Sequence, residues 1–249
     1  MNIGLYQSAA ALSSLERWQD AVSQNITSAQ VTGFKRRSVQ VAAEAHGEIL
    51  TQPGAKPDNG DGMPALFPQT RYSIAFNPGE NNPTRRELDV ALSGPGFFTV
   101  RKPDGNTAYT RAGELQVRAD RTLVTAQGCE VLNNSGSPIQ LSQEGGAIVV
   151  MEDGTVRHGE NIVGKLGIAK ATNPARLISM ASGLFLADTG AGMVPVEKPI
   201  IQQGYLEGSN VSPLREMVDL VNISRAYEAN QKLIQSRDGI MQKTLDAVS

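Results

Sequence analysis

Few residues in this sequence have the type and spacing that catalysis requires. Gly159, Gly164 and Lys165 reproduce part of a phosphate-binding loop, G-x-x-x-x-G-K. The loop needs a serine or threonine next, to bind magnesium, and this chain has Leu166 there. A strand pattern follows where the motif requires a helix, so we expect no nucleotide site. We expect no other cofactor either.

A pair of adjacent carboxylates, Glu152 and Asp153, is a second candidate for chemistry. Two carboxyl groups can flank a glycosidic bond as acid and base or nucleophile. Acidic residues directly before a glycine such as Gly154 are also typical of a hairpin turn. We expect turn formers and no enzyme, and keep hydrolysis of cell-wall glycan as the alternative function.

Metal ligands are sparse. Cys129 is the single cysteine, which excludes an intramolecular disulfide and a cysteine-based metal site. His46 and His158 are far apart in sequence. The run 58–61 resembles a calcium loop, but Gln69 stands where an EF-hand needs a carboxylate. We therefore expect no metal.

Charge and hydropathy limit the partners. The net charge is −2 with both signs interspersed, so nothing attracts the chain to nucleic acid or to an anionic membrane. Lys35, Arg36 and Arg37 form the only basic run, which we expect to be a solvated corner. No stretch reaches the roughly 18 apolar residues of a spanning helix, so no membrane insertion is expected. The first residues lack the apolar run of a cleavable secretory signal.

The two ends of the chain share a helical pattern. Apolar residues recur at the heptad spacing that allows helices to supercoil, which predicts two one-sided helices that need a partner. The expected seam consists of Leu5, Leu12, Leu15, Val22, Ile26, Met217, Leu220, Tyr227, Ile234, Met241 and Leu245. Gly33 is the expected stop of the first helix, and Ser212-Pro213 opens the last one.

The sequence between the helices has two different patterns. Residues 35–86 are rich in proline and glycine, which predicts an extended, irregular connector. Residues 87–210 alternate short apolar runs with turns, among them Asp104-Gly105 and Asp153-Gly154, which predict antiparallel hairpins. The expected fold is α+β: helices at 1–34 and 211–249 form a coiled-coil-like layer, and 87–210 form a central antiparallel β domain.

Several strings resemble one known family. Gln24-Asn25-Ile26 with Thr32-Gly33-Phe34-Lys35, and Gly204-Tyr205-Leu206-Glu207-Gly208-Ser209-Asn210, are similar to the terminal signatures of bacterial flagellar rod and hook proteins. Leu88 to Leu92, Gly94 to Phe98 and Tyr109 to Gly113 resemble the β domain of that family. The family motif is represented by Asn25, Gly33, Phe34, Asp89, Gly96, Phe97, Phe98, Gly204, Leu206, Glu207, Ser209 and Asn210.

The resemblance implies a structural subunit of the flagellar basal-body rod. Such a subunit would be exported unfolded by the flagellar type III apparatus and polymerise helically in the cell envelope, with copies of itself and neighbouring rod proteins. The terminal helices would form the inner layer, with the β domain outside it. Thr27, Ser28 and Val31 depart from the family pattern. The opening Met1 to Tyr6 and the short length favour the proximal over the distal rod protein.

Overall fold

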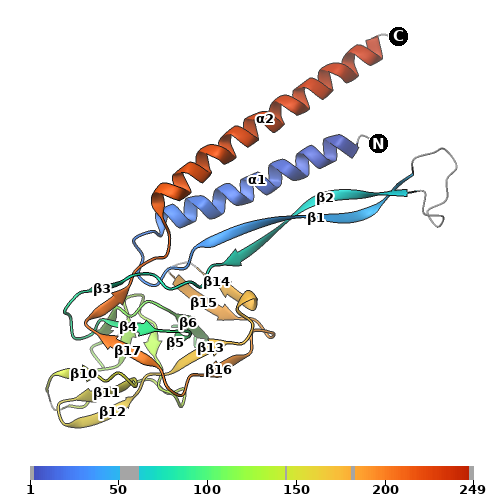
Figure 1. Cartoon of the computed structure of the whole chain (residues 1–249). Coiled ribbons are helices and arrows are strands. Elements are labelled where there is room, and N and C mark those ends of the chain that lie inside the picture. The colour runs from blue at the N-terminus through green and yellow to red at the C-terminus, as the bar shows by residue number, and fades with distance from the viewer. Residues whose placement is uncertain (1–2, 51–61, 144, 181–182, 247–249) are drawn as a thin grey trace. The chain divides into compact units, whose positions relative to one another are not determined.

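The computed structural model describes residues 3–50, 62–143, 145–180 and 183–246 (Figure 1). The chain divides into two compact units. The helical unit comprises Met1–Ile26, Arg37–Ser73 and Ser212–Ser249, and the β unit comprises Thr27–Arg36 and Ile74–Val211. Each unit is therefore assembled from segments that are distant in the sequence.

Both expected terminal helices are present. Helix α1 spans Ile3–Thr27 and helix α2 spans Pro213–Asp246. Helix α2 begins at the predicted proline, and it continues through Gly239. Helix α1 ends before the predicted stop, and turns lead from Thr27 to Gly33, which has a φ of 68°. Neither helix has a stretch apolar enough to cross a bilayer, as far as the described residues show.

The segment expected to be an irregular connector contains regular structure. Strands β1 (Arg37–Leu50) and β2 (Gly62–Ile74) pair in a two-stranded sheet, the long hairpin of Figure 1. A bond between the Ser38 and Ser73 hydroxyls, 2.6 Å long, places the start of β1 beside the end of β2. Prolines are tolerated in β2 because each strand of a two-stranded sheet has one edge that needs no partner.

The hairpin gives α1 a second neighbour. The Thr70 hydroxyl on β2 donates to the Ser14 hydroxyl at 3.0 Å, and Ser14 donates to the Ala10 carbonyl. Near its other end α1 meets α2, where the Asn25 amide donates to a Glu216 carboxylate oxygen at 2.9 Å. The helix is thus held by both a strand and a helix, whereas the sequence pattern alone indicated only a helical partner.

The β unit is an assembly of antiparallel sheets. Its nine-stranded sheet has the order β14-β15-β6-β5-β9-β8-β7, with β13 paired to β5 and to β16. These strands are β5 (Phe97–Arg101), β6 (Thr107–Thr110), β7 (Leu115–Val117), β8 (Leu123–Thr125), β9 (Glu130–Val131), β13 (Ile168–Ala171), β14 (Leu177–Ser179), β15 (Leu184–Ala187) and β16 (Met193–Pro195).

Smaller sheets complete the unit. Strands β10, β11 and β12 form one sheet, β17 pairs with β4, and β18 pairs with β3. Their bounds are β3 (Asn81–Pro83), β4 (Val90–Ser93), β10 (Ile148–Val150), β11 (Thr155–His158), β12 (Asn161–Lys165), β17 (Ile200–Gln203) and β18 (Tyr205–Glu207). A 3-10 turn, Pro174–Arg176, precedes β14.

Both predicted Asp-Gly hairpins are confirmed. Strand β5 pairs with β6 across the turn at Gly105, and β10 pairs with β11 across the turn at Gly154. Gly105 and Gly154 have φ angles of 82° and 89°, in the left-handed region that glycine enters without a steric penalty. The glycine in each turn therefore determines where these two hairpins form.

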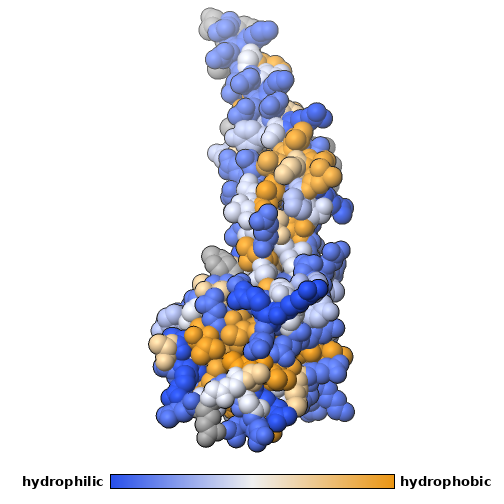
Figure 2. All heavy atoms as spheres, turned by 90° about the vertical axis from the view of Figure 1, so that its left-hand side faces the viewer, coloured by the Kyte–Doolittle hydropathy of each residue, from blue (hydrophilic) through white to orange (hydrophobic). Residues whose placement is uncertain are grey.

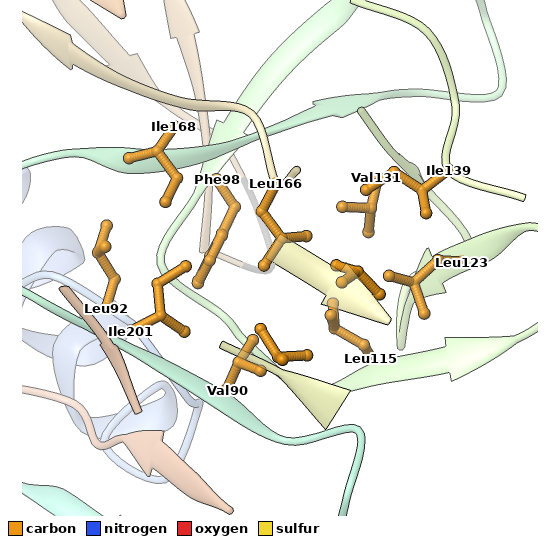
Figure 3. Close-up of a cluster of buried hydrophobic side chains, with 12 residues drawn as sticks. Val90, Leu92, Phe98, Leu115, Leu123, Val131, Ile139, Leu166, Ile168 and Ile201 are labelled. Carbon is orange, nitrogen blue, oxygen red and sulfur yellow. The ribbon is translucent and has the colours of Figure 1, made fainter. Parts of the chain in front are cut away.

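The core of the β unit joins strands from several sheets (Figure 3). Twelve buried apolar residues form its main cluster, among them Phe98 on β5, Ile201 on β17, and Leu166 in the segment between β12 and β13. A second cluster contains Phe97, whose ring centroid lies 5.3 Å from that of Phe185 and 5.6 Å from that of Phe76. Phe97 and Phe98 thus face different clusters, as alternation along a strand requires.

Candidate functional site

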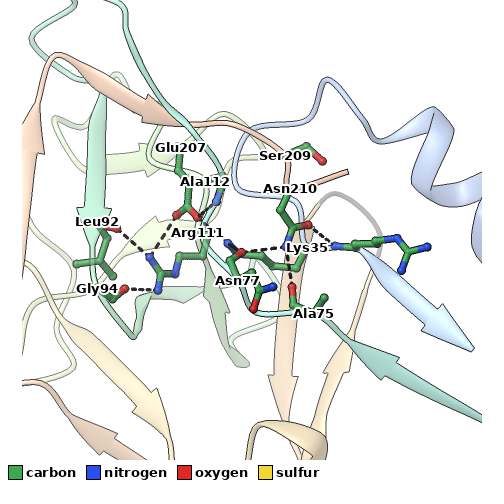
Figure 4. Close-up of polar contacts among 12 residues, drawn as sticks. Lys35, Ala75, Asn77, Leu92, Gly94, Arg111, Ala112, Glu207, Ser209 and Asn210 are labelled. Atoms are coloured by element: carbon green, nitrogen blue, oxygen red, sulfur yellow. Dashed lines mark hydrogen bonds and ion pairs between the residues drawn. The ribbon is translucent and has the colours of Figure 1, made fainter. Parts of the chain in front are cut away.

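The most unusual feature of the β unit is a buried group of charges, Lys35, Arg111 and Glu207, which we term the polar centre (Figure 4). Glu207 and Lys35 are each 1% exposed, and Arg111 is 5% exposed. The three residues come from the loop after α1, the segment after β6, and β18. Since charged residues are rarely buried unless paired, this cluster identifies the point where three chain segments must fit together.

The Glu207 carboxylate is shared between the two cations. One oxygen accepts from Lys35 Nζ at 2.6 Å and from the Gly79 amide at 3.0 Å. The other oxygen accepts from Arg111 Nη1 at 3.2 Å. Lys35 also donates to the Asn77 carbonyl at 2.9 Å, and Arg111 donates to backbone carbonyls of the β4 segment. Almost all polar atoms of the cluster are therefore satisfied.

Burial changes the pKa of both cations in the same direction. Desolvation lowers the pKa of Lys35 and that of Arg111, and the Glu207 charge and hydrogen bonds oppose the shift in both. The polar centre holds two cations for one carboxylate, so its net charge is positive. Removing the carboxylate would leave both cations buried without an opposite charge.

Asn210 extends the polar centre toward the loop after α1. Its carbonyl oxygen accepts from the Arg36 amide at 2.7 Å, and its side-chain amide donates to the Ala75 and Asn77 carbonyls at 2.8 and 2.9 Å. The Ser209 hydroxyl accepts from the Val211 amide at 3.3 Å. One asparagine thus joins segments that precede and follow the hairpin.

Two motif glycines have the positive φ angles that favour glycine. A Cβ on Gly33 would lie 2.4 Å from the Arg111 carbonyl carbon, and the Gly33 amide donates to the Glu207 carbonyl at 2.8 Å. Gly204 has a φ of 79° and its amide donates to the Asp89 carbonyl at 2.7 Å. A side chain at Gly33 would push apart the segments that carry the polar centre.

The other motif residues of the β unit are mainly buried. Asp89 is 0% exposed, and Arg86 lies 3.8 Å from its carboxylate. A Cβ on Gly96, whose φ is 139°, would meet an Ile168 methyl at 3.0 Å. The remaining motif side chains are buried or half-buried: Phe34, Phe97, Phe98 and Leu206.

The basic run is not the solvated corner that its sequence indicated. Lys35 is buried and ion-paired with Glu207, 172 positions away in the chain. The correction has a plain physical cause: a partner that distant leaves no local pattern, and three adjacent charges ordinarily remain in water. The family resemblance included Lys35 and Glu207 in its strings but gave no reason to pair them.

The expected seam has mixed exposure. Val22 is buried, Met217 is 50% exposed, and other seam residues are half-buried: Leu12, Leu15, Ile26, Leu220, Tyr227 and Ile234. The side chains of Leu5, Met241 and Leu245 lie outside the described residues. Among the α2 side chains that the structure describes, the fully buried ones are Glu216 and Ile223, which fall on the same stripe as Leu220 and Tyr227.

Asn25 and Glu216 form a polar contact that the apolar spacing did not predict. Both are 0% exposed. Asn25 donates to Glu216 at 2.9 Å and to the Arg37 carbonyl at 2.8 Å, and its oxygen accepts from the Arg37 amide at 2.9 Å. Asn25 therefore links α1 to α2 and to the start of β1 with one side chain.

The residues considered for catalysis are in turns and strands. The Asp153 carboxylate accepts from the amide and hydroxyl of Thr155, which holds its pKa below the usual value. Gly164 and Lys165 lie in β12. No cluster of three metal-ligating side chains occurs among the described residues, and positions 58–61 lie outside them.

Comparison with known proteins assigns the class. Residues 202–247 match the family described as flagellar basal body rod FlgEFG protein C-terminal, and residues 91–158 match the flagellar hook protein FlgE/F/G D1 domain. The first match contains Glu207 and Asn210, and the second contains Arg111. These matches fit a structural subunit.

Full-length relatives support the same assignment. The chain is 31% identical over 236 residues to the flagellar basal-body rod protein FlgF of Caulobacter vibrioides, covering 95% of this chain and 94% of the relative. It is 32% identical over 256 residues to FlgG of Borreliella burgdorferi, covering 95% of each. Against FlgG of Agrobacterium fabrum it is 36% identical over 62% of each chain.

The chain belongs to the family of flagellar basal-body rod proteins. Proteins of this family are structural subunits without enzymatic activity. The glycan hydrolase alternative is thereby set aside, and Asp153 has the turn role that its neighbour Gly154 indicated.

Proposed function

We propose that this protein polymerises helically through its terminal helices and forms part of the drive shaft of the flagellum. The observation that carries the proposal is apolar surface on α2 that the folded chain leaves in water. The most exposed of these side chains are Leu214 (76%), Ile240 (62%), Val218 (54%), Val221 (51%), Met217 (50%) and Leu233 (47%).

Polymerisation would remove this surface from water. Burying an apolar side chain contributes about 1.5–3 kcal/mol, and the polar positions between these residues would remain at the rim. Apolar side chains of both units reach the molecular surface in Figure 2. Under this proposal α1 and α2 form a coiled-coil-like inner layer, in contact with copies of the chain and with neighbouring rod proteins.

A substitution on the exposed face of α2 tests the proposal. Val218→Asp should block polymerisation and swimming, because an aspartate at a dry contact must lose its water without a partner, at a cost of several kcal/mol. Since Val218 is 54% exposed, the single chain should still fold. Gln231→Glu adds the same charge at an exposed polar position of α2 outside this apolar face and serves as the matched control.

The measurements are filament formation by electron microscopy and swimming in a strain that lacks the wild-type protein. Normal assembly by the Val218→Asp variant would contradict the proposal. Loss of assembly by both variants would also contradict it, because the effect would then be one of charge and not of an apolar contact.

We propose further that the chain reaches its place through the flagellar type III export apparatus and lies in the periplasmic part of the rod. The opening residues Met1 to Tyr6 favour the proximal position. Placement of this chain's side chains in a map of the intact basal body would test the position directly.

A further inference from the structure

A cavity of about 100 Å³ borders the polar centre. Its buried wall includes Lys35, Phe97 and Arg111, and the Arg111 guanidinium carbon lies 5.5 Å from the centre of the Phe97 ring. The wall thus combines two cations with an aromatic face. All of these residues belong to the β unit.

The outer wall of the cavity is exposed. Pro95, Lys170 and Pro174 line it, and all three are exposed to solvent. Lys170 lies on β13 and adds a third positive charge to the two beneath it. The cavity therefore leads from solvent to a buried, positively charged wall.

The charges of the wall are not balanced. Lys35 and Arg111 share one carboxylate, Glu207, and Arg111 Nε is buried with no hydrogen-bond partner among the described residues. An unsatisfied buried donor costs free energy that an acceptor would recover. A second anion in the cavity would supply the missing charge close to both cations.

The volume of the cavity limits what can enter. Sites for cofactors and metabolites usually measure about 300–1,000 Å³, whereas one water takes about 30 Å³. A cavity of about 100 Å³ accommodates a carboxylate with one or two methylene groups. Phe97 and Phe76 provide apolar contact for such a stem.

We propose that this cavity binds the carboxylate of an acidic side chain from a neighbouring rod subunit. The choice of neighbour rests on the proposed polymerisation, while the binding chemistry rests on the cavity alone. The cavity would act as a socket in which the entering carboxylate pairs with Lys170 at the mouth and with Arg111 within. It would thereby couple subunit contact to the residues that join three segments of the β unit.

The test uses the full-length chain and a blocked glutamate, N-acetyl-glutamate N-methylamide. Amide resonances of Gly96, Phe97 and Ala171 report on the cavity in a two-dimensional NMR titration. The glutamate probe should shift them saturably, and the neutral glutamine counterpart should bind about tenfold more weakly, as expected for loss of a charge-assisted bond.

A variant at the mouth avoids disturbing the fold. Lys170→Gln should weaken binding of the glutamate probe about two- to fivefold, in keeping with an exposed charge. Lys198→Gln removes another exposed lysine of the β unit that lies outside the cavity, and it should leave binding unchanged. Equal binding of the two probes, or equal affinities of the two lysine variants, would overturn the proposal.

Two further measurements separate the sources of the anion. Sulfate that binds as tightly as the glutamate probe would identify a general inorganic-anion site and overturn the side-chain assignment. Saturating glutamate probe should slow polymerisation of the wild-type chain, and unchanged polymerisation would overturn the role of a neighbouring subunit. Failure of the polymerisation proposal itself would appear with Val218→Asp, and it would leave probe binding intact.

Discussion

The Glu207→Gln variant is the strongest test of how the β unit is held together. Glutamine preserves the shape of the side chain but removes the charge that Lys35 and Arg111 share. Donors approach both oxygens of Glu207 in the native structure, from Lys35 and Gly79 on one and from Arg111 on the other. Whichever way the new amide turns, its NH2 group would face a donor.

The expected loss is large for one substitution. Removing one partner of a buried ion pair typically costs about 3–5 kcal/mol, because the remaining charge stays desolvated. Glu207 is 1% exposed, so solvent offers little compensation. For a unit of this size each kcal/mol lowers the melting temperature by about 2–4 °C, so a fall of roughly 10 °C is expected.

The loss should depend on pH through Lys35. Burial places the pKa of Lys35 below its usual value of 10.5, so the folded chain binds fewer protons than the unfolded chain between that lowered pKa and 10.5. Stability therefore rises with pH in this window. Without Glu207, the pKa of Lys35 falls further and the rise begins at lower pH. The difference in free energy of unfolding between variant and wild type should therefore shrink at alkaline pH. Part of it should remain, because Arg111 stays charged.

The chain provides its own reporters for this assay. Cys129, the single cysteine, is 2% exposed in the β unit, and burial raises the pKa of its thiol. Trp18, the single tryptophan, is half-buried in the helical unit. Thiol labelling during thermal unfolding then follows the β unit, and indole fluorescence follows the helices.

The matched control is Glu197→Gln, an exposed carboxylate of the β unit. Its free energy of unfolding should lie within about 0.5 kcal/mol of the wild-type value. The role assigned to the polar centre would be refuted if Glu207→Gln lowered the free energy of unfolding by less than about 1 kcal/mol. It would also be refuted if the loss had the same size at neutral and at alkaline pH.

Three other outcomes are expected. Asn25→Ala should destabilise the helical unit by about 1–3 kcal/mol, because it leaves Glu216 without its amide donor; unchanged helix melting by circular dichroism would contradict this. Gly113→Ala should prevent folding of the β unit, since a Cβ there would lie 1.6 Å from the Val90 carbonyl oxygen. A Cβ at Gly145 would meet no atom within 4 Å, so Gly145→Ala should fold and protect the buried thiol from labelling as the wild-type chain does. Polymerisation should shift Trp18 emission to the blue, and an unchanged spectrum on assembly would argue against burial of α1 in the rod.

Local sequence patterns were sufficient for several elements. The Asp-Gly pairs specified two hairpins because only a few residue types enter the left-handed region. Pro213 marked the start of α2 because its fixed φ suits the first helical turn and its missing amide has no partner there.

Longer-range features required the folded chain. The prolines of 35–86 indicated an irregular connector, yet β1 and β2 pair because a two-stranded sheet leaves each strand an edge where proline costs nothing. On α2 the apolar spacing identified Leu220 and Tyr227, but Glu216 is buried on the same stripe because Asn25 supplies its donor. A polar residue at a seam cannot be recognised without its partner.

The sequence by itself determined the class of this protein, its terminal helices and its antiparallel β unit, because periodicity, turn residues and family motifs are encoded in neighbouring positions. Only the tertiary structure decided where the charges lie. Lys35 had the local environment of a solvated residue, and its burial depends on Glu207 and Asn77, which the chain brings to it from distant segments. Pairing between remote residues is a property of the topology, so a lysine and a glutamate far apart in sequence give no signal until the backbone has placed them within hydrogen-bonding distance.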